Sequence, residues 1–264
     1  FPILRSLPIP SNKPFQDQER AAKQVYRLVE DLVQQEQDID SNSKKLTLLQ
    51  RLKLARDQET GQGLSKDEIM AQMISAIVAG HETTSWTLSW ILLVLANHPE
   101  VQDKVREEVL QALPSNAHVS IDHLDKMPYL YAVIKECQRL YPAVANLVRR
   151  AIKDDKIGQY FIPAGTPVII HFGAMMRDDS IWPEAEKFKP ERFLGEQRPE
   201  LYHYLPFATG AHHCLGFQFA RVQLRIVLAR LIQNFKFTAP ENVHFKRKLK
   251  VFLKSEPTIR LLVQ

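Results

Sequence analysis

The sequence is short of cysteine and of long apolar runs, and both shortages exclude classes of protein. Its two cysteines, Cys137 and Cys214, lie far apart in the chain. So few cysteines argue against a disulfide framework and favour a reducing compartment. No stretch reaches the roughly 18 uninterrupted apolar residues of a membrane span. The first residues also lack the basic, apolar and small-residue order of a signal peptide.

The net charge of the sequence is also small. The 35 Lys and Arg residues exceed the 30 Asp and Glu residues by a formal net charge of +5. This diffuse excess predicts at most a basic face for an acidic partner and no nucleic-acid binding. The 45% hydrophobic and 25% charged content is typical of a globular protein. A chain of 264 residues is long enough for one large core or two modest domains.

Helical periodicity dominates the first half of the sequence. A capping box, in which Ser65 and Glu68 bond each other's backbone amides, marks the start of the longest predicted helix. Pro99 and Pro128 each open another helix, and residues 35–45 read as a polar loop. The pattern predicts helices over residues 16–36, 46–54, 65–97, 99–113 and 128–141.

The second half has a different sequence pattern, with short apolar runs separated by Gly and Pro. These runs predict strands over residues 147–152, 159–162, 166–171, 249–253 and 258–263. Residues 181–206 show little periodicity, and residues 215–235 return to a helical pattern. There is no internal repeat and no low-complexity tract. The fold class predicted is mainly α with a small β component.

An apolar patch with three prolines opens the sequence, FPILRSLPIP. It is consistent with a loop that enters a helix or with a loop that touches a membrane surface. Composition alone favours the first alternative.

The stretch Ile77–Ser85, IVAGHETTS, is unusual for a helix interior. Gly costs about 1 kcal/mol against Ala in a helix, and a buried, unpartnered Glu would cost more. Ala76, Gly80, Thr83 and Thr87 share one face, so something flat or bulky could approach the backbone there. Thr hydroxyls can open the helix locally, and Glu82 beside Thr83 offers a proton relay. The alternative is close helix packing with a solvated Glu82.

The loop Phe207–Gly216, FATGAHHCLG, places Cys214 just before a long predicted helix. The amides and dipole of a helix N-terminus stabilise a thiolate, and a thiolate is an axial ligand of haem iron. A zinc site is a rival hypothesis, although its candidate ligands are mostly adjacent and the usual Cys-x-x-Cys spacing is missing. A buried loop cysteine without function is the third alternative. The zinc candidates are His203, His212, His213 and Cys214.

Glu136 and Arg139 lie three residues apart on the helix after Pro128. Periodicity places them beside the apolar face and does not decide whether they are buried. A buried pair would need a further partner, and Arg192 in the irregular segment is a candidate.

Together these residues resemble the cytochrome P450 superfamily of haem-thiolate monooxygenases. The resemblance rests on four motifs in the family's order, which are Ala79–Thr84, Glu136-x-x-Arg139, Pro190–Phe193 and Phe207–Gly216. It covers nearly the whole chain and is closest to eukaryotic microsomal members. It implies a fold with a long distal helix, a haem-binding loop and small β-sheets.

The resemblance also implies a role for each matched residue. Cys214 would ligate the iron of haem b, Glu82 and Thr83 would deliver protons to bound oxygen, and the distal helix would be locally opened there. Phe207 would pack near the sulfur, and Gly210 and Gly216 would permit the tight haem-binding loop. His212 and Arg149 would bind the haem propionates. Glu136, Arg139 and Arg192 would form a structural triad behind the haem loop. Hydrophobic substrate would contact Ala76, Ala79, Thr83, Val144, Leu147 and Phe252.

Family members are roughly twice as long as this chain, so residues 1–264 are expected to be the C-terminal half of a single domain. The implied partners are a hydrophobic small molecule, O2 and a reductase that passes on electrons from NADPH. The implied location is the cytoplasmic face of the endoplasmic reticulum membrane, through an anchor outside this sequence. Two alternatives stay open, a haem-thiolate isomerase or dehydratase and an inactive fragment of a monooxygenase.

Overall fold

The computed structural model describes residues 13–35, 46–113, 117–195, 200, 202–241, 244–249 and 252–264. The chain divides into two units, residues 1–79 and 80–264, and each is described by itself. The apolar patch over residues 1–10 and most of the predicted loop over residues 35–45 lie outside the described residues.

The first unit is helical, as predicted. It contains α1 (Lys13–Gln35), α2 (Leu48–Leu54) and the beginning of α3 (Lys66–Asn97). The predicted capping box at the start of α3 is present, because the Glu68 amide donates to Ser65 Oγ at 3.3 Å and the Ser65 amide donates to Glu68 Oε2 at 2.7 Å. These bonds lower the pKa of Glu68. The helix therefore begins where local sequence chemistry places it.

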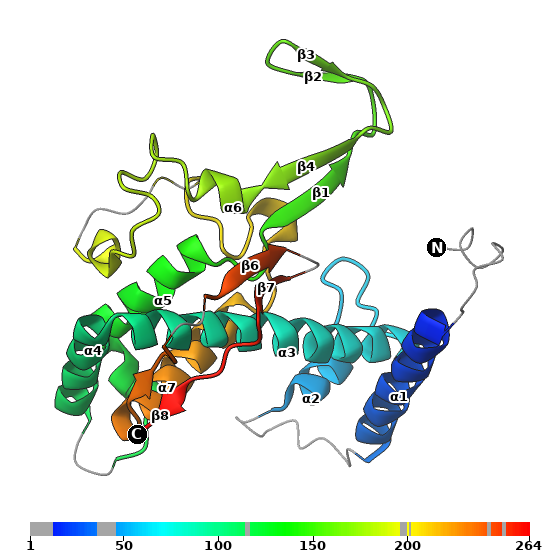
Figure 1. The fold of residues 1–264 in the computed structure, drawn as a ribbon. Coiled ribbons are helices and arrows are strands. Elements are labelled where there is room, and N and C mark those ends of the chain that lie inside the picture. The colour runs from blue at the N-terminus through cyan, green and yellow to red at the C-terminus, as the bar shows by residue number, and fades with distance from the viewer. Residues whose placement is uncertain are drawn as a thin grey trace. The chain divides into compact units, whose positions relative to one another are not determined.

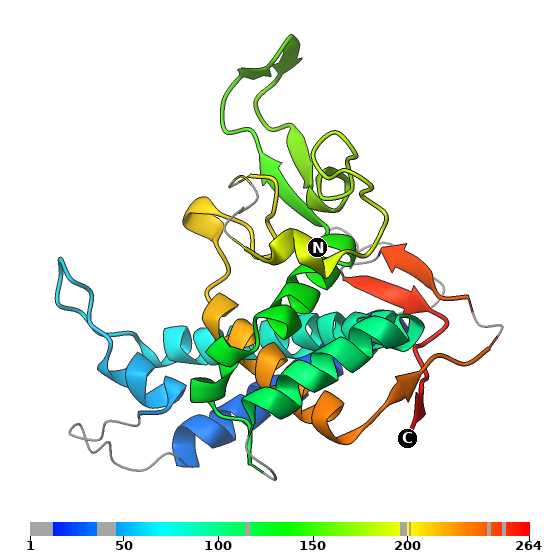
Figure 2. The same cartoon turned by 90° about the vertical axis from the view of Figure 1, so that its left-hand side faces the viewer.

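The second unit is built on four helices, with the remainder of α3 joined by α4 (Pro99–Ala112), α5 (Pro128–Leu140) and α7 (Phe217–Asn234). A short 3-10 helix, η2 (Ile121–Lys126), precedes α5. Pro99 and Pro128 occupy first helical positions, where the missing amide hydrogen has no helical partner anyway. Figure 2 shows α5 and α7 packed against each other, with the C-terminal strands to one side of the helices.

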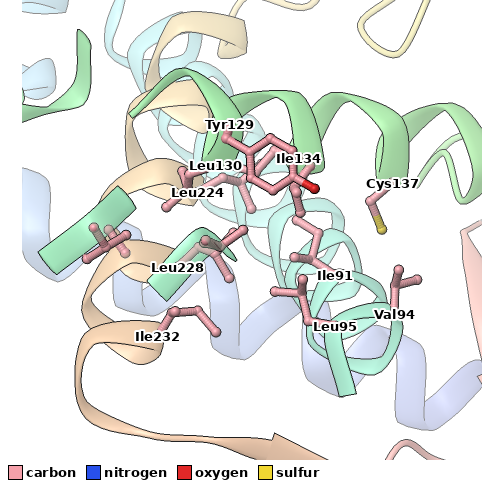
Figure 3. Packing of buried hydrophobic residues seen from close by; sticks show 14 of the residues in the cluster. Ile91, Val94, Leu95, Tyr129, Leu130, Ile134, Cys137, Leu224, Leu228 and Ile232 are labelled. Atoms are coloured by element: carbon pink, nitrogen blue, oxygen red, sulfur yellow. The ribbon is translucent and has the colours of Figure 1, made fainter. Parts of the chain in front are cut away.

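A continuous apolar core fills the space between these helices (Figure 3). Each completely buried aliphatic side chain contributes about 1.5–3 kcal/mol relative to an exposed one. The core therefore supplies the main force that packs α3, α4, α5 and α7 together. Its most deeply buried members include Trp90, Ile91, Leu95, Val105, Val109, Leu130, Val133, Ile134, Leu228 and Ile232.

The β component consists of antiparallel two-stranded sheets. The strands β1 (Asn146–Arg150) and β4 (Pro167–His171) pair with each other, and so do β2 (Asp155–Ile157) and β3 (Tyr160–Ile162). The β2–β3 hairpin extends beyond the β1–β4 pair (Figure 1). The strand β2 was not predicted, because its residues are all exposed and carry no apolar alternation. Short helices α6 (Phe172–Met175), η3 (Pro190–Phe193) and η4 (Gly210–His212) interrupt the following loops.

The C-terminal strands differ from the prediction. The predicted strand over residues 249–253 is wrong, because Leu249 ends β6 (Lys246–Leu249), Leu253 begins β7 (Leu253–Glu256), and the two residues pair with each other. The basic residues of β6 are exposed and gave no strand signal. Of the last predicted strand, over residues 258–263, only β8 (Leu262–Val263) is a strand, and it pairs with β5 (Phe237–Thr238).

A buried glutamine on α4 joins the helical core to this last sheet. The side chain of Gln102 is 0% exposed and donates to the carbonyl oxygens of Leu95 at 3.0 Å and Phe237 at 2.9 Å. Its Oε1 accepts from the Phe237 amide at 2.8 Å. Lys236 and Gln264 exchange backbone hydrogen bonds, so the next residue, Phe237, points its own backbone groups away from β8 and toward Gln102.

Replacing Gln102 with Leu is expected to destabilise the chain by about 3–5 kcal/mol, because the buried amide and carbonyl of Phe237 lose their partner and each orphaned group costs about 1–3 kcal/mol. Urea unfolding followed by circular dichroism measures the change. The matched control is Gln111→Leu on the same helix, where an exposed side chain bonds only Glu107 and the expected change lies within about 0.5 kcal/mol. Equal losses in the two variants would contradict the role of Gln102.

Candidate functional site

The loop before α7 folds back on itself around Cys214. The Cys214 amide donates to the carbonyl oxygen of Phe207 at 2.9 Å, which closes the loop. Ala208 and Gly210 have positive φ angles of 58° and 70°. Gly210 takes this conformation freely, while Ala208 carries some strain. The sequence did not mark Ala208 for this role, since alanine gives no turn signal.

Gly216 plays a different part from the one expected. Its φ of −84° is open to any residue, so it is not needed for the tight turn. It lies at the N-terminal boundary of α7, where its carbonyl oxygen accepts from the Ala220 amide at 2.9 Å. The tight geometry of the loop depends on Ala208 and Gly210 instead.

The two cysteines occupy opposite environments. Cys137 on α5 is 1% exposed, and burial, with a further contribution from the Glu136 carboxylate, raises the pKa of its thiol well above the usual range. Cys214 is a free, exposed thiol just before α7. Of the two, only Cys214 can present sulfur to a ligand outside the protein core.

The zinc hypothesis fails on the positions of its ligands. His203 lies 3.6 Å from Glu200, and His213 packs edge-on against Phe217 with ring centroids 4.5 Å apart. In the part of the chain that the structure describes, no three His, Cys, Asp or Glu side chains are placed to hold a metal ion together.

The other predicted haem-contact side chains lie on β1, on η4 and in the loop before η4. Arg149 lies on β1, half-buried, and donates to the carbonyl oxygen of Val148 at 3.1 Å. His212 is exposed on η4. Among the described residues, no hydrogen bond or ion pair joins either side chain to Cys214. Phe207 is half-buried and contacts Phe217 at a centroid distance of 6.4 Å.

Glu136 and Arg139 form a completely buried ion pair on α5. Both side chains are 0% exposed, and Arg139 donates through Nε and Nη2 to the two carboxylate oxygens at 2.8 and 2.9 Å. Arg192 Nε lies 3.4 Å from Glu136 Oε1. The structure thus brings together the three residues that the sequence paired only conditionally.

Backbone groups complete this buried cluster. Arg139 also donates to the carbonyl oxygens of Met176 at 2.6 Å and Ala185 at 2.8 Å, while the Lys189 amide donates to Glu136 Oε1 at 3.0 Å. No sequence pattern pointed to these partners, because backbone groups carry no residue-specific signal. They satisfy the donors and acceptors that a buried ion pair requires.

On the distal helix, α3 continues without interruption through Gly80–Ser85, so the expected local opening is not observed. Hydroxyl groups do bond back along the helix. Thr87 Oγ1 donates to the carbonyl oxygen of Thr83 at 2.9 Å, and Ser85 Oγ donates to that of His81 at 2.7 Å. These bonds are accommodated within regular helix.

Glu82 has a partner that the sequence did not reveal. Lys254 on β7 places its Nζ 3.0 Å from Glu82 Oε1. The two residues are 172 positions apart, so no local pattern could have paired them.

The predicted substrate residues have varied surroundings. Leu147 packs against the buried cluster of Phe172, Met176 and Leu205. Val144 and Phe252 are half-buried and belong to segments joined by a bond from the Leu253 amide to the carbonyl oxygen of Ala143 at 3.0 Å. Ala76 and Ala79 are exposed residues of α3 in the first unit.

Comparison with known proteins decides the family. The sequence profile named Cytochrome P450 matches residues 1–263. The chain belongs to the cytochrome P450 family. The expected resemblance to this family, and to its eukaryotic members, is confirmed.

Individual P450 relatives agree in sequence and fold. Cytochrome P450 3A12 of Canis lupus familiaris is 41% identical over 197 residues, which are 74% of this chain and 39% of that protein. Cytochrome P450 3A29 of Sus scrofa is 38% identical over 215 residues, or 80% and 43% of the two chains. A retinoic acid-bound cyanobacterial CYP120A1 superposes with a TM-score of 0.86 at 30% identity over 98% of this chain and 60% of that one.

This P450 chain spans about two fifths of the length of these curated relatives. The predicted fold, mainly α with small β-sheets, is confirmed by the structure and by its structural neighbours. None of the helices in the described part of the chain is long and apolar enough to cross a membrane.

The family implies haem iron and the use of O2, and the donor chemistry of this chain fits haem. Cys214 is a soft sulfur donor three residues before the 18-residue helix α7. Leu215 and Phe219 beside it are 92% and 70% exposed and present apolar surface. A large apolar cofactor that takes a sulfur ligand would match both features.

Replacing Glu136 with Gln is expected to lower stability by about 3–5 kcal/mol, because Arg139 keeps a buried charge without a charged partner. Urea unfolding at neutral pH measures the loss. The matched control is Asp103→Asn, which removes one partner of the exposed Lys236–Asp103 pair and should cost less than about 1 kcal/mol. A cost for Glu136→Gln as small as that of the control would show that the buried pair does not anchor α5.

Proposed function

We propose that this chain provides the iron ligand and the oxygen-side helix of a haem-thiolate monooxygenase. The observation that carries the proposal is the free, exposed Cys214 at the start of α7 in a chain of the P450 family. Because the chain spans about two fifths of its relatives, the activity belongs to the protein as a whole.

The proposed reaction inserts one oxygen atom of O2 into a hydrophobic substrate. Substrate R–H, O2, NADPH and a proton give R–OH, water and NADP+, with the two electrons of NADPH arriving through a reductase. When bound through a thiolate, haem supplies oxygen activation, because the sulfur donates electron density that favours O–O cleavage.

The residues of the chain take separate parts in this reaction. Cys214 would hold the iron, Phe207 would shield the sulfur, and His212 and Arg149 would bind the propionates. Only a protonated His212 would carry charge for that contact. Glu82 and Thr83 would hold and pass the protons that O–O cleavage consumes.

The substrate side is apolar in character. Val144, Leu147 and Phe252 are half-buried apolar residues in the segments around β1 and β7. With Thr83 they would form a pocket for a hydrophobic small molecule. Ala76 and Ala79, in the first unit, are further proposed substrate contacts. Membrane association of the whole protein, at the endoplasmic reticulum, would deliver such substrates.

The pairing of Glu82 with Thr83 favours a monooxygenase over a haem-thiolate isomerase or dehydratase. An enzyme that needs no external electrons has no use for proton delivery to oxygen. Both residues are present on α3, and Glu82 is held by Lys254.

The role of Cys214 as the iron ligand is tested by absorption spectroscopy. After reconstitution with haem, reduction and exposure to carbon monoxide, the chain should give the strongly red-shifted Soret band of a thiolate complex. Cys214→Ser should abolish that band, and Cys137→Ala should retain it because Cys137 is buried in the core. Haem uptake with an unchanged band in Cys214→Ser would remove Cys214 as the ligand.

The role of Thr83 in proton delivery is tested by the coupling of oxygen use to product formation. In the reductase-coupled protein, Thr83→Ala should lower the product formed per O2 consumed by about tenfold or more, because general acid catalysis contributes about 10²–10⁴-fold. Oxygen uptake and product yield measured together give this ratio. Ser89→Ala is the control, since it removes another hydroxyl of α3, one that donates to the carbonyl oxygen of Ser85 at 2.8 Å. An unchanged ratio in Thr83→Ala would contradict the role of Thr83.

A further inference from the structure

We propose that Lys254 is a positioning residue, which holds the carboxylate of Glu82 in place and ties it to the strand that follows Phe252. The inference rests on the proposed function, because positioning matters only if Glu82 passes protons.

The contact itself is direct. Lys254 Nζ lies 3.0 Å from Glu82 Oε1, within hydrogen-bond distance. The same ammonium lies 5.5 Å from the ring centroid of Trp86, one turn further along α3. A charged hydrogen bond and a cation–π contact therefore act on one ammonium group.

The placement of Lys254 is set by a buried neighbour. Trp90 Nε1 donates to the carbonyl oxygen of Leu253 at 3.0 Å, and this bond is buried. Leu253 is 7% exposed, and its amide donates to the carbonyl oxygen of Ala143 at 3.0 Å. The backbone immediately before Lys254 is thus fixed from both sides.

These contacts follow a single ridge of α3. Glu82, Trp86 and Trp90 are spaced by four residues and so lie above one another on one helix face. Leu253 bonds Trp90, and Lys254 contacts Trp86 and Glu82, so the contacts lie at three successive turns of the helix. The register of β7 against α3 therefore determines where the ammonium stands.

Fixing Glu82 has a consequence for chemistry. A glutamate side chain has several rotatable bonds, and proton transfer needs its oxygen within hydrogen-bond reach of the acceptor. The side chains of Lys254 and Glu82 are 32% and 42% exposed, so without a partner the carboxylate would sample other rotamers. Because Phe252 directly precedes β7, a proposed substrate contact lies two residues before Lys254, the partner of the proposed acid.

The first test needs no haem. Unfolding of the full chain is measured for Lys254→Met, Glu82→Gln and the double variant. The unfolding equilibrium constant of the double variant should differ about two- to fivefold from the product of the single effects, the range found for partly exposed pairs. Strict multiplicativity of the single effects would overturn the pairing and with it the proposal.

The second test uses the haem-loaded, reductase-coupled protein. Lys254→Met should lower product per O2 consumed by about threefold or more and raise the solvent deuterium isotope effect on product formation, with haem content and carbon monoxide spectrum unchanged. Lys254→Arg should restore both readouts because it keeps the charge and the reach. Lys248→Met is the matched control, since Lys248 on β6 forms an exposed pair with Glu256 at 2.8 Å.

The outcomes separate the two proposals. If the unsubstituted protein makes product and Lys254→Met shows the same coupling and the same isotope effect, the positioning role of Lys254 is wrong and the proposed function still stands. Failure of Lys254→Arg to restore coupling would also overturn it, because only the packing of lysine would then matter. If the unsubstituted protein makes no product, the proposed function falls and takes the positioning role with it.

Discussion

The completely buried ion pair between Glu136 and Arg139 is the constraint on which the second half of the chain depends. Charges removed from water need every donor and acceptor occupied, and here the backbone around Met176, Ala185 and Lys189 supplies the remaining bonds. One pair on α5 therefore fixes a stretch of chain that has little regular hydrogen bonding of its own.

Aromatic packing extends this anchor toward the cysteine loop. The Arg139 guanidinium lies 5.2 Å from the ring centroid of Trp182, and Trp182 packs with Phe193 and Tyr204. The Tyr204 hydroxyl donates to the carbonyl oxygen of Lys135 on α5 at 3.1 Å. Since the cysteine loop, Phe207–Gly216, begins three residues after Tyr204, its start is fixed to α5. The position of the proposed iron ligand thus follows from the buried pair.

The two proposed functional regions are held by interactions of different strength. Behind the cysteine loop the ions are 0% exposed, so breaking the pair is costly. On α3, Glu82 and Lys254 are partly exposed, and such a pair contributes little to stability. The first arrangement suits a ligand that must stay in one place. The second holds the carboxylate of the proposed proton carrier beside Lys254 and adds little to the stability of the fold.

Three helix starts and the family could be predicted from the sequence alone, because both depend on local chemistry. Ser65, Pro99 and Pro128 mark helix starts through their own caps and missing amides, and the Cys214 and Glu136-x-x-Arg139 motifs identify the P450 family. Only the tertiary structure decided that Glu136 and Arg139 are buried, that exposed basic residues form β6, and that Lys254 meets Glu82. Each of these depends on residues far apart in the chain, and neither helical periodicity nor a short motif extends that far.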